Sequence, residues 1–328
     1  MTRRSSRAAR ACLAILLPAL LVAGAPLPPD LLSGLVWRNV GPFRGGRISA
    51  ASGVIGDPGT FYVGLPQGGV WKTTSGGSTW WPVFDGVPGV SSIGAIAVAP
   101  SNGNVIYAGT GDLFTNVLYD RANGMYRSTD AGATWAHLGL DSANRISAIL
   151  VDPRDANVVL VAAYGFTRKK NNMRGIFRTT DGGATWTHPF ANSDTTAVSA
   201  LAAAYDRPDV VYATANRWYV APRGAAAPVA TPGQSPTAGL GIFKSIDGGV
   251  TWTRLAGSTV PKWSGRTRIA VAQGTNAQRV YFVSNAGLYR SDDGGATWRQ
   301  MAQDDHRIRN GQGGYNCGVL VDPKNPDV

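Results

Sequence analysis

The sequence predicts an all-β fold made of repeated four-stranded antiparallel units. One observation behind this is an eleven-residue pattern that occurs five times, and the other is that two short apolar runs precede each copy. The pattern reads apolar, aromatic, Arg/Lys, Ser/Thr, any residue, Asp, any residue, Gly, any residue, Thr, Trp. Consecutive copies begin 46 to 66 residues apart, a period typical of a stacked structural repeat. The copies are Val70–Trp80, Met125–Trp135, Ile176–Trp186, Ile242–Trp252 and Leu288–Trp298.

Each copy predicts a β-hairpin with a short turn. The apolar-aromatic pair ends one strand, and glycine allows the positive φ angles of a tight turn. The Asp carboxylate is expected to accept backbone N–H groups inside the turn, and Thr-Trp to begin the next strand with the indole packed on a neighbouring unit. The first copy has Ser75 in place of the aspartate. The structural residues predicted in this way are Asp130, Asp181, Asp247, Asp293, Trp80, Trp135, Trp186, Trp252 and Trp298.

The apolar runs before each hairpin supply two further strands per unit. Four strands per unit is the blade of a β-propeller. First (inner) strands are expected at 47–54, 93–99, 145–151, 198–204, 268–272 and 318–321, and second strands at 61–63, 105–107, 158–162, 210–212 and 280–282. The five whole blades span about 47–82, 93–138, 145–189, 198–255 and 268–300. A leading strand at 35–40 and a sixth blade beginning at 317 make the expected structure an incomplete ring, the N-terminal part of a larger propeller within 35–328.

The hairpin pattern, Ser-x-Asp-x-Gly-x-Thr-Trp, resembles the Asp-box or BNR repeat. That repeat occurs in propellers of sialidases, xyloglucanase-type glycoside hydrolases, sortilin-type Vps10 domains and photosystem II assembly factors. The resemblance covers about residues 36–328 and implies that the aspartates are structural and lie away from the central channel. Vps10 domains rely on cysteines, whereas this chain has only Cys12 and Cys317, so the likeness to them is partial.

Residues 1–25 are predicted to be a secretory signal, followed by a linker at 26–34. Four arginines precede an apolar run at 11–23, and Ala-Gly-Ala at 23–25 provides a cleavage site. The run is short for a membrane span, although an uncleaved anchor is the alternative. We therefore expect an exported protein, periplasmic, cell-surface or extracellular, without a membrane span in the mature chain. Cys317 is then the single thiol, expected in the core, and no internal disulfide is possible.

The charge and motif content exclude several classes of partner. The formal net charge is +11, but four of the arginines lie in the first ten residues and no dense basic run follows. Nucleic acid is therefore not an expected partner. No metal-ligand spacing or phosphate-binding loop occurs, so no metal and no cofactor are expected.

Chain length varies only between second and third strands and between blades, at about 109–124, 164–175, 217–241 and 301–316. In propeller topology these connections emerge on one face, and variable loops on a rigid scaffold concentrate binding. Arginines on this face suit the carboxylate of a sugar acid, with pairing to neighbouring acids as the alternative. A tyrosine beside acids is also what a sialidase nucleophile requires. The candidate ligand-binding residues are Arg44, Arg47, Asp112, Asp120, Arg121 and Tyr315.

The hydrolytic motifs of the resembled families are incomplete here. Pro66 stands where xyloglucanase-type enzymes have a catalytic Asp, and the Phe-Arg-Ile-Pro of sialidases is represented only by Phe43-Arg44. No catalytic residue is therefore predicted. The expected function is a propeller scaffold that binds a carbohydrate or a peptide. The alternatives are a glycoside hydrolase with carboxylates partly beyond this sequence, and an assembly-factor-like chaperone propeller.

Overall fold

The computed structural model describes residues 47–90, 92–112, 122–166, 172–191, 194–217, 239–263, 265–305, 308 and 318–328. All of them belong to one compact unit, Gly46–Val328. Several expectations fall outside the described residues: the signal at 1–25, the linker at 26–34 and the strand at 35–40. The same holds for Arg44, Asp120, Arg121, Tyr315 and Cys317.

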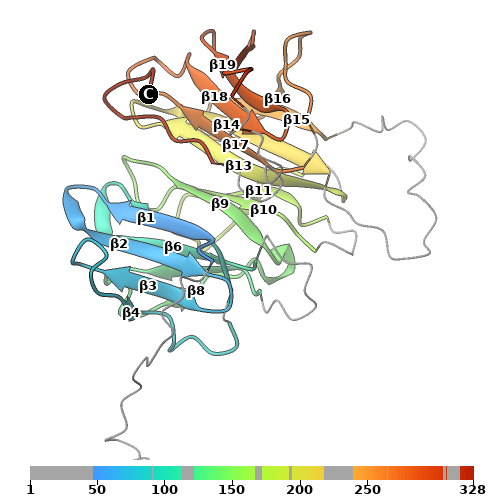
Figure 1. Cartoon of the computed structure of the whole chain (residues 1–328). Helices are drawn as coiled ribbons and strands as arrows, with labels where there is room; N and C mark the ends of the chain where they lie inside the picture. The colour runs from blue at the N-terminus through green and yellow to red at the C-terminus, as the bar shows by residue number, and fades with distance from the viewer. Residues whose placement is uncertain are drawn as a thin grey trace, which may run out of the picture. The chain divides into compact units, whose positions relative to one another are not determined.

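Five four-stranded antiparallel sheets make up the described chain, and in each the strands follow one another in sequence order (Figure 1). Sheet 1 consists of β1 (Ala50–Val54), β2 (Asp57–Leu65), β3 (Gly69–Thr73) and β4 (Trp81–Pro82), and sheet 2 of β5 (Ile93–Ala99), β6 (Asn102–Thr110), β7 (Met125–Ser128) and β8 (Ala136–His137). Sheet 3 consists of β9 (Ile146–Val151), β10 (Val159–Ala163), β11 (Gly175–Thr179) and β12 (Thr187–Phe190). Sheet 4 consists of β13 (Thr196–Ala204), β14 (Arg207–Arg217), β15 (Gly241–Ser245) and β16 (Thr253–Arg254), and sheet 5 of β17 (Thr267–Val271), β18 (Val280–Ser284), β19 (Gly287–Ser291) and β20 (Arg299–Met301). One short 3-10 helix, Asp141–Ala143, lies between sheets 2 and 3.

These sheets confirm the predicted all-β fold of four-stranded antiparallel units. The predicted strand at 93–99 coincides with β5, and the other four first strands begin within three residues of the expected position. The hairpin expectation needs one correction, because every fourth strand begins one residue after the tryptophan, so that Thr-Trp belongs to the turn. The physical reason is that the turn ties this threonine to the aspartate, as described below.

Consecutive sheets pack through their first strands, β1 on β5, β5 on β9, β9 on β13 and β13 on β17. Ser49 Oγ donates a hydrogen bond to the carbonyl of Ile93, and Ser52 Oγ accepts one from the amide of Val98 at 3.0 Å. The beginning of β1 thus lies beside the beginning of β5, so the first strands run in the same direction. We call the end of the sheets where first strands begin and second strands end the loop end. The opposite end, with the turns that join first to second and third to fourth strands, is the hairpin end.

The apolar core lies between successive sheets and contains four of the five repeat tryptophans. Trp298 is 6% exposed in the cluster shared by sheets 4 and 5. Trp135 packs edge-on against Phe84, which follows sheet 1, with ring centroids 5.1 Å apart, and donates from Nε1 to the Val83 carbonyl at 2.7 Å. Trp80, in the first copy, is 38% exposed. The indole therefore contributes buried area only where a preceding sheet covers it.

Each of the four Asp-containing turns is closed by the same set of hydrogen bonds. Asp130 accepts the backbone N–H of Thr134 at 2.8 Å and the hydroxyl of Thr134 at 2.6 Å. The hydroxyl of Ser128 donates to the same carboxylate at 2.7 Å and accepts the N–H of Gly132 at 2.8 Å. In the first copy, Ser75 Oγ accepts the Thr79 amide at 2.9 Å and also bonds to the hydroxyls of Thr79 and Thr73, at 2.9 and 3.3 Å, so a neutral hydroxyl takes the place of the carboxylate. The carboxylate therefore organises the turn locally, without help from other sheets.

We expect these turns to make the protein sensitive to acid. Hydrogen bonds from Thr134 and Thr297 lower the pKa values of Asp130 and Asp293 to about 2, whereas an unfolded Asp titrates near 3.9. The lowered pKa means that the stabilisation is complete above about pH 4 and is lost as the pH falls through about 2. The double variant Asp130→Asn/Asp293→Asn should therefore melt at lower temperature at pH 7 and show a shallower decline of Tm between pH 5 and pH 2. Parallel calorimetric curves for the two proteins over that range would refute this role.

Residues 318–321, predicted as the first strand of a sixth unit, do not form a strand, and Leu320 is 94% exposed. No strand of the described chain pairs with them, and a strand needs such a partner for its hydrogen bonds. The next segment nevertheless repeats the turn between β9 and β10. The amide of Asp152 donates to the carbonyl of Val158 at 2.9 Å, and the amide of Asp322 donates to that of Val328 at 2.7 Å.

Candidate functional site

Two of the predicted ligand-binding residues meet at the loop end of sheets 1 and 2. Arg47 lies shortly before β1 and Asp112 shortly after β6. Arg47 Nη2 forms an ion pair with Asp112 Oδ2. The Asp112 side chain is 3% exposed and that of Arg47 is 40% exposed. A buried carboxylate requires a partner of opposite charge. The pair therefore joins sheets 1 and 2, which corresponds to the alternative of pairing with a neighbouring acid.

A denser group of charges lies at the loop end of sheets 3 and 5. Tyr164 follows β10 directly, and its phenol experiences the charges of Arg266, Arg268, Arg174 and Arg145. Arg145 precedes β9, Arg174 precedes β11, and the other two lie at the start of β17. Tyr164, Arg145, Arg174 and Arg266 are each at most 6% exposed, and Arg268 is half-buried. We call these five residues the arginine cluster.

Local backbone geometry places Tyr164 and Arg174 in this cluster. The amide of Tyr164 donates to the carbonyl of Arg145 at 2.7 Å, which continues the pairing of β9 with β10. Arg174 Nη1 donates to the Tyr164 carbonyl at 2.5 Å, and its Nη2 donates to the carbonyl of Phe166. Gly165 has φ +71°, and a Cβ there would lie 2.8 Å from Arg174 Cγ, so only glycine leaves room for this side chain. Arg174 thus ties the end of β10 to the start of β11.

The electrostatics of the cluster follow from burial of several positive charges. Burial raises the pKa of Tyr164, while the four guanidinium groups act in the opposite direction. Burial also lowers the pKa of Arg174 to about 10, although the charge of Asp194 works against this shift. Arg268 Nη1 donates to the Ser199 carbonyl at 3.2 Å, which joins sheet 5 to sheet 4. Guanidinium groups gathered in a poorly solvated place attract carboxylate or another oxyanion.

Three further observations on the described residues concern acid-base catalysis, metal binding and membrane crossing. Pro66 follows β2 at the loop end, and proline has no acid-base group. Among the residues that the structure places, no group of three or more His, Cys, Asp and Glu side chains is arranged to hold a metal ion. No helix in the same residues is long and apolar enough to cross a membrane.

Sequence reasoning selected Arg47 but missed Arg145, although one signal was available. Arg-Ile-Ser occurs at 47–49 and again at 145–147, at the start of the first strand in both cases. Arg174 and Tyr164 lay in a connection that was recognised as variable. Arg268 carries part of the same signal, since Arg-Ile begins the predicted first strand at 268–272. Arg266 carries none, and only the packing of sheets brings its charge to act on Tyr164.

Comparison with solved structures decides the architecture. The chain superimposes on an ancestral GH74 enzyme with a TM-score of 0.59 and 20% identity, covering 90% of this chain and 35% of that one. The Niastella koreensis GH74 enzyme gives a TM-score of 0.55 at 21% identity, with 76% and 38% covered. Both are β-propellers. The chain is a β-propeller. Its five sheets are blades, and the arginine cluster lies at the loop end of the propeller blades.

Sequence comparison finds xyloglucanases. The propeller is 29% identical over 183 residues to a xyloglucanase of Hypocrea jecorina, which covers 51% of this chain and 20% of that enzyme. It is 28% identical over 260 residues to a xyloglucanase of a Paenibacillus species, with 72% and 23% covered. The chain thus spans less than a quarter of the length of these two relatives. No protein-family model matches the propeller.

Proposed function

We propose that the protein is an exported propeller that binds a carboxylate-bearing carbohydrate at its loop end. The arginine cluster is the observation that supports this proposal, because the charges of four guanidinium groups from two blades act on one buried phenol at the loop end. A planar guanidinium donates two parallel hydrogen bonds to a carboxylate. Arg268 is the half-buried member of the cluster, so we propose that its guanidinium contacts the ligand. The similarity to xyloglucanases supports a saccharide as the ligand class. Arg44, Asp120, Arg121 and Tyr315 are proposed as further contacts from connections on the same face.

We also propose the Asp-box assignment for the five hairpins and a sixth blade that begins at residue 317. The repeated hydrogen bonds of the Asp130 type support the first proposal. The turn at 322–328, which matches the turn at 152–158 between β9 and β10, supports the second. We further propose that residues 1–25 are an export signal, on the basis of the arginines and the apolar run described above.

Glycoside hydrolysis is the second candidate function. The 28% identity to a xyloglucanase over 260 residues favours it. Hydrolysis with retention or inversion requires two carboxyl groups that flank the scissile bond. Pro66 at the position of one such group, and the pairing of Asp112 with Arg47, speak for binding without cleavage.

The test is calorimetric titration of the protein with oligogalacturonate, oligoglucuronate and neutral xyloglucan oligosaccharides, with reducing-sugar release measured on every ligand that binds. We expect an acidic oligosaccharide to bind without release. Arg268→Gln should weaken the binding of this oligosaccharide about tenfold or more. Arg268→Lys should weaken it less, because lysine keeps the charge but lacks the paired N–H donors of the guanidinium group. Arg299→Gln is the matched control, since Arg299 is 58% exposed at the hairpin end.

Each other outcome has a defined meaning. Binding of neutral oligosaccharides with equal affinity, unchanged by Arg268→Gln, would overturn the role of the arginine cluster. Release of reducing sugar would replace the scaffold function by hydrolysis. The folded state of each variant is checked by circular dichroism, so that a loss of binding is not confused with a loss of structure.

A further inference from the structure

In every sheet, one residue of the second strand lies opposite the basic residue of the hairpin pattern on the third strand. The side chain of this second-strand residue faces the next sheet along the chain. Four sheets have tyrosine at this position, and sheet 3 has leucine. The pairs are Tyr62 with Lys72, Tyr107 with Arg127, Leu160 with Arg178, Tyr212 with Lys244 and Tyr281 with Arg290.

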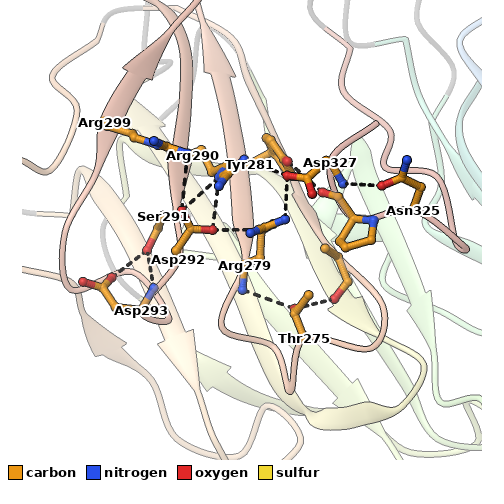
Figure 2. Close-up of polar contacts among 12 residues, drawn as sticks. Thr275, Arg279, Tyr281, Arg290, Ser291, Asp292, Asp293, Arg299, Asn325 and Asp327 are labelled. Atoms are coloured by element: carbon orange, nitrogen blue, oxygen red, sulfur yellow. Dashed lines mark hydrogen bonds and ion pairs between the residues drawn. The ribbon is translucent and has the colours of Figure 1, made fainter.

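Each tyrosine hydroxyl donates to a backbone carbonyl of the following segment. Tyr107 reaches the carbonyl of Ala156 at 2.9 Å, and Tyr281 that of Pro326 at 2.7 Å. Figure 2 shows Tyr281 beside Arg290, with the segment that carries Asp327 docked against them. In sheets 1, 2 and 4 the basic partner lies over the tyrosine ring, with the cation 5.3–5.6 Å from its centroid. A phenol between a cation and a carbonyl is thus a standard part of these junctions.

The junction between sheets 4 and 5 gives the most complete example. The Gly294 carbonyl accepts the hydroxyl of Tyr212 at 3.0 Å and the ammonium group of Lys244 at 3.1 Å. The corresponding carbonyl between sheets 3 and 4 is that of Gly248, which accepts Arg178 Nε at 3.1 Å. Among the described residues no hydroxyl donates to it, because leucine replaces the tyrosine there.

A pocket lies at this junction, at the hairpin end of sheets 3 and 4. It has a volume of about 190 Å³, and its walls include Leu160, Val211, Arg178, Asp209 and Gly248. Leucine is shorter than tyrosine, so it leaves open the outer part of the space that a phenol would fill. Apolar cavities of about 150 Å³ bind benzene, so the volume is sufficient for one aromatic ring.

We propose that this pocket binds a phenol group supplied from outside the chain. The ring would lie against Leu160 and Val211 with the Arg178 guanidinium over its face. Its hydroxyl would donate to the Gly248 carbonyl, as Tyr212 does to Gly294. The ligand class is a 4-hydroxyphenyl group, carried by a small phenol or by the tyrosine of a partner polypeptide. This site lies at the opposite end of the sheets from the arginine cluster and does not depend on the proposed carbohydrate binding.

The probe is p-cresol, which is the tyrosine side chain as a free molecule, titrated into the full chain and followed by NMR. We expect saturable binding at millimolar concentration and at least threefold weaker binding of toluene, which lacks the hydroxyl. Leu160→Tyr should abolish binding, because the new phenol fills the pocket and bonds to Gly248. Arg178→Gln should weaken binding severalfold, since the cation is removed while the ring space remains.

Tyr107→Leu provides the matched gain-of-function variant. It recreates the sheet 3 arrangement between sheets 2 and 3, so it should add a second p-cresol site with the Ala156 carbonyl as acceptor. N-acetyl-tyrosinamide distinguishes the two sources of phenol: if it binds with p-cresol, the ligand is a peptide tyrosine, and if p-cresol alone binds, the ligand is a small phenol. Absence of p-cresol binding to the unmodified protein, or binding that persists in Leu160→Tyr, would overturn the proposal.

Discussion

Trp298→Ala is expected to reduce the free energy of unfolding by about 3–5 kcal/mol, whereas Trp80→Ala should cost less than about 1 kcal/mol. Both residues end the same hairpin pattern, and both donate from Nε1 to a carbonyl of their own turn, at 3.0 and 2.9 Å. They differ in what covers the ring. Trp298 is 6% exposed and packs edge-on near Phe282, whereas Trp80 is 38% exposed.

Denaturant unfolding of the two variants and the unmodified protein measures this difference. Because both indoles donate to a carbonyl of their own turn, each variant serves as the control for the other. Equal losses would mean that the indole stabilises its own hairpin rather than the contact between sheets. That result would contradict the role assigned here to inter-sheet packing.

Gly175→Ala is expected to destabilise the protein by more than about 3 kcal/mol. Gly175 begins β11 with φ +133°, and a Cβ there would lie 1.8 Å from the carbonyl oxygen of Phe190. A backbone conformation this sparsely populated costs an L-residue about 1–3 kcal/mol, and the contact with backbone cannot be relieved by a side-chain rotation. β12 would have to move, and Phe190 would leave its contacts with Phe243 and Trp252, at 4.6 and 6.0 Å between ring centroids.

Gly86→Ala is the control for this substitution, since a Cβ at that position meets nothing within 4 Å. Thermal unfolding and near-ultraviolet circular dichroism of both variants provide the measurement. We expect a large fall in Tm and altered aromatic signals for Gly175→Ala, and values near those of the unmodified protein for Gly86→Ala. A normal Tm for Gly175→Ala would show that β12 accommodates the methyl group without loss of packing.

The strands were predictable because their signals are local. Turn chemistry within eleven residues marks each hairpin, and an apolar run such as 93–99 marks a strand buried on both faces. Boundaries were less predictable where pairing extends beyond the apolar run, as in β14, which covers Arg207–Arg217 rather than the predicted 210–212. The 318–321 segment forms no strand among the described residues, since an apolar run forms a strand only when another strand pairs with it.

The sequence by itself determined the all-β class, the four-stranded repeat and the hairpin turns, because each depends on residues that are neighbours along the chain. Tertiary structure alone decided that the charges of Arg145 and Arg266 both act on Tyr164, since first strands from different sheets must pack before residues at their ends influence one another. Tertiary structure also decided that Leu160 borders a pocket. Leucine stands where the other sheets have tyrosine, and this difference leaves space only because the next sheet brings the Gly248 carbonyl to that place. Contacts between sheets join residues far apart in the chain, and no local sequence pattern encodes which of them become neighbours.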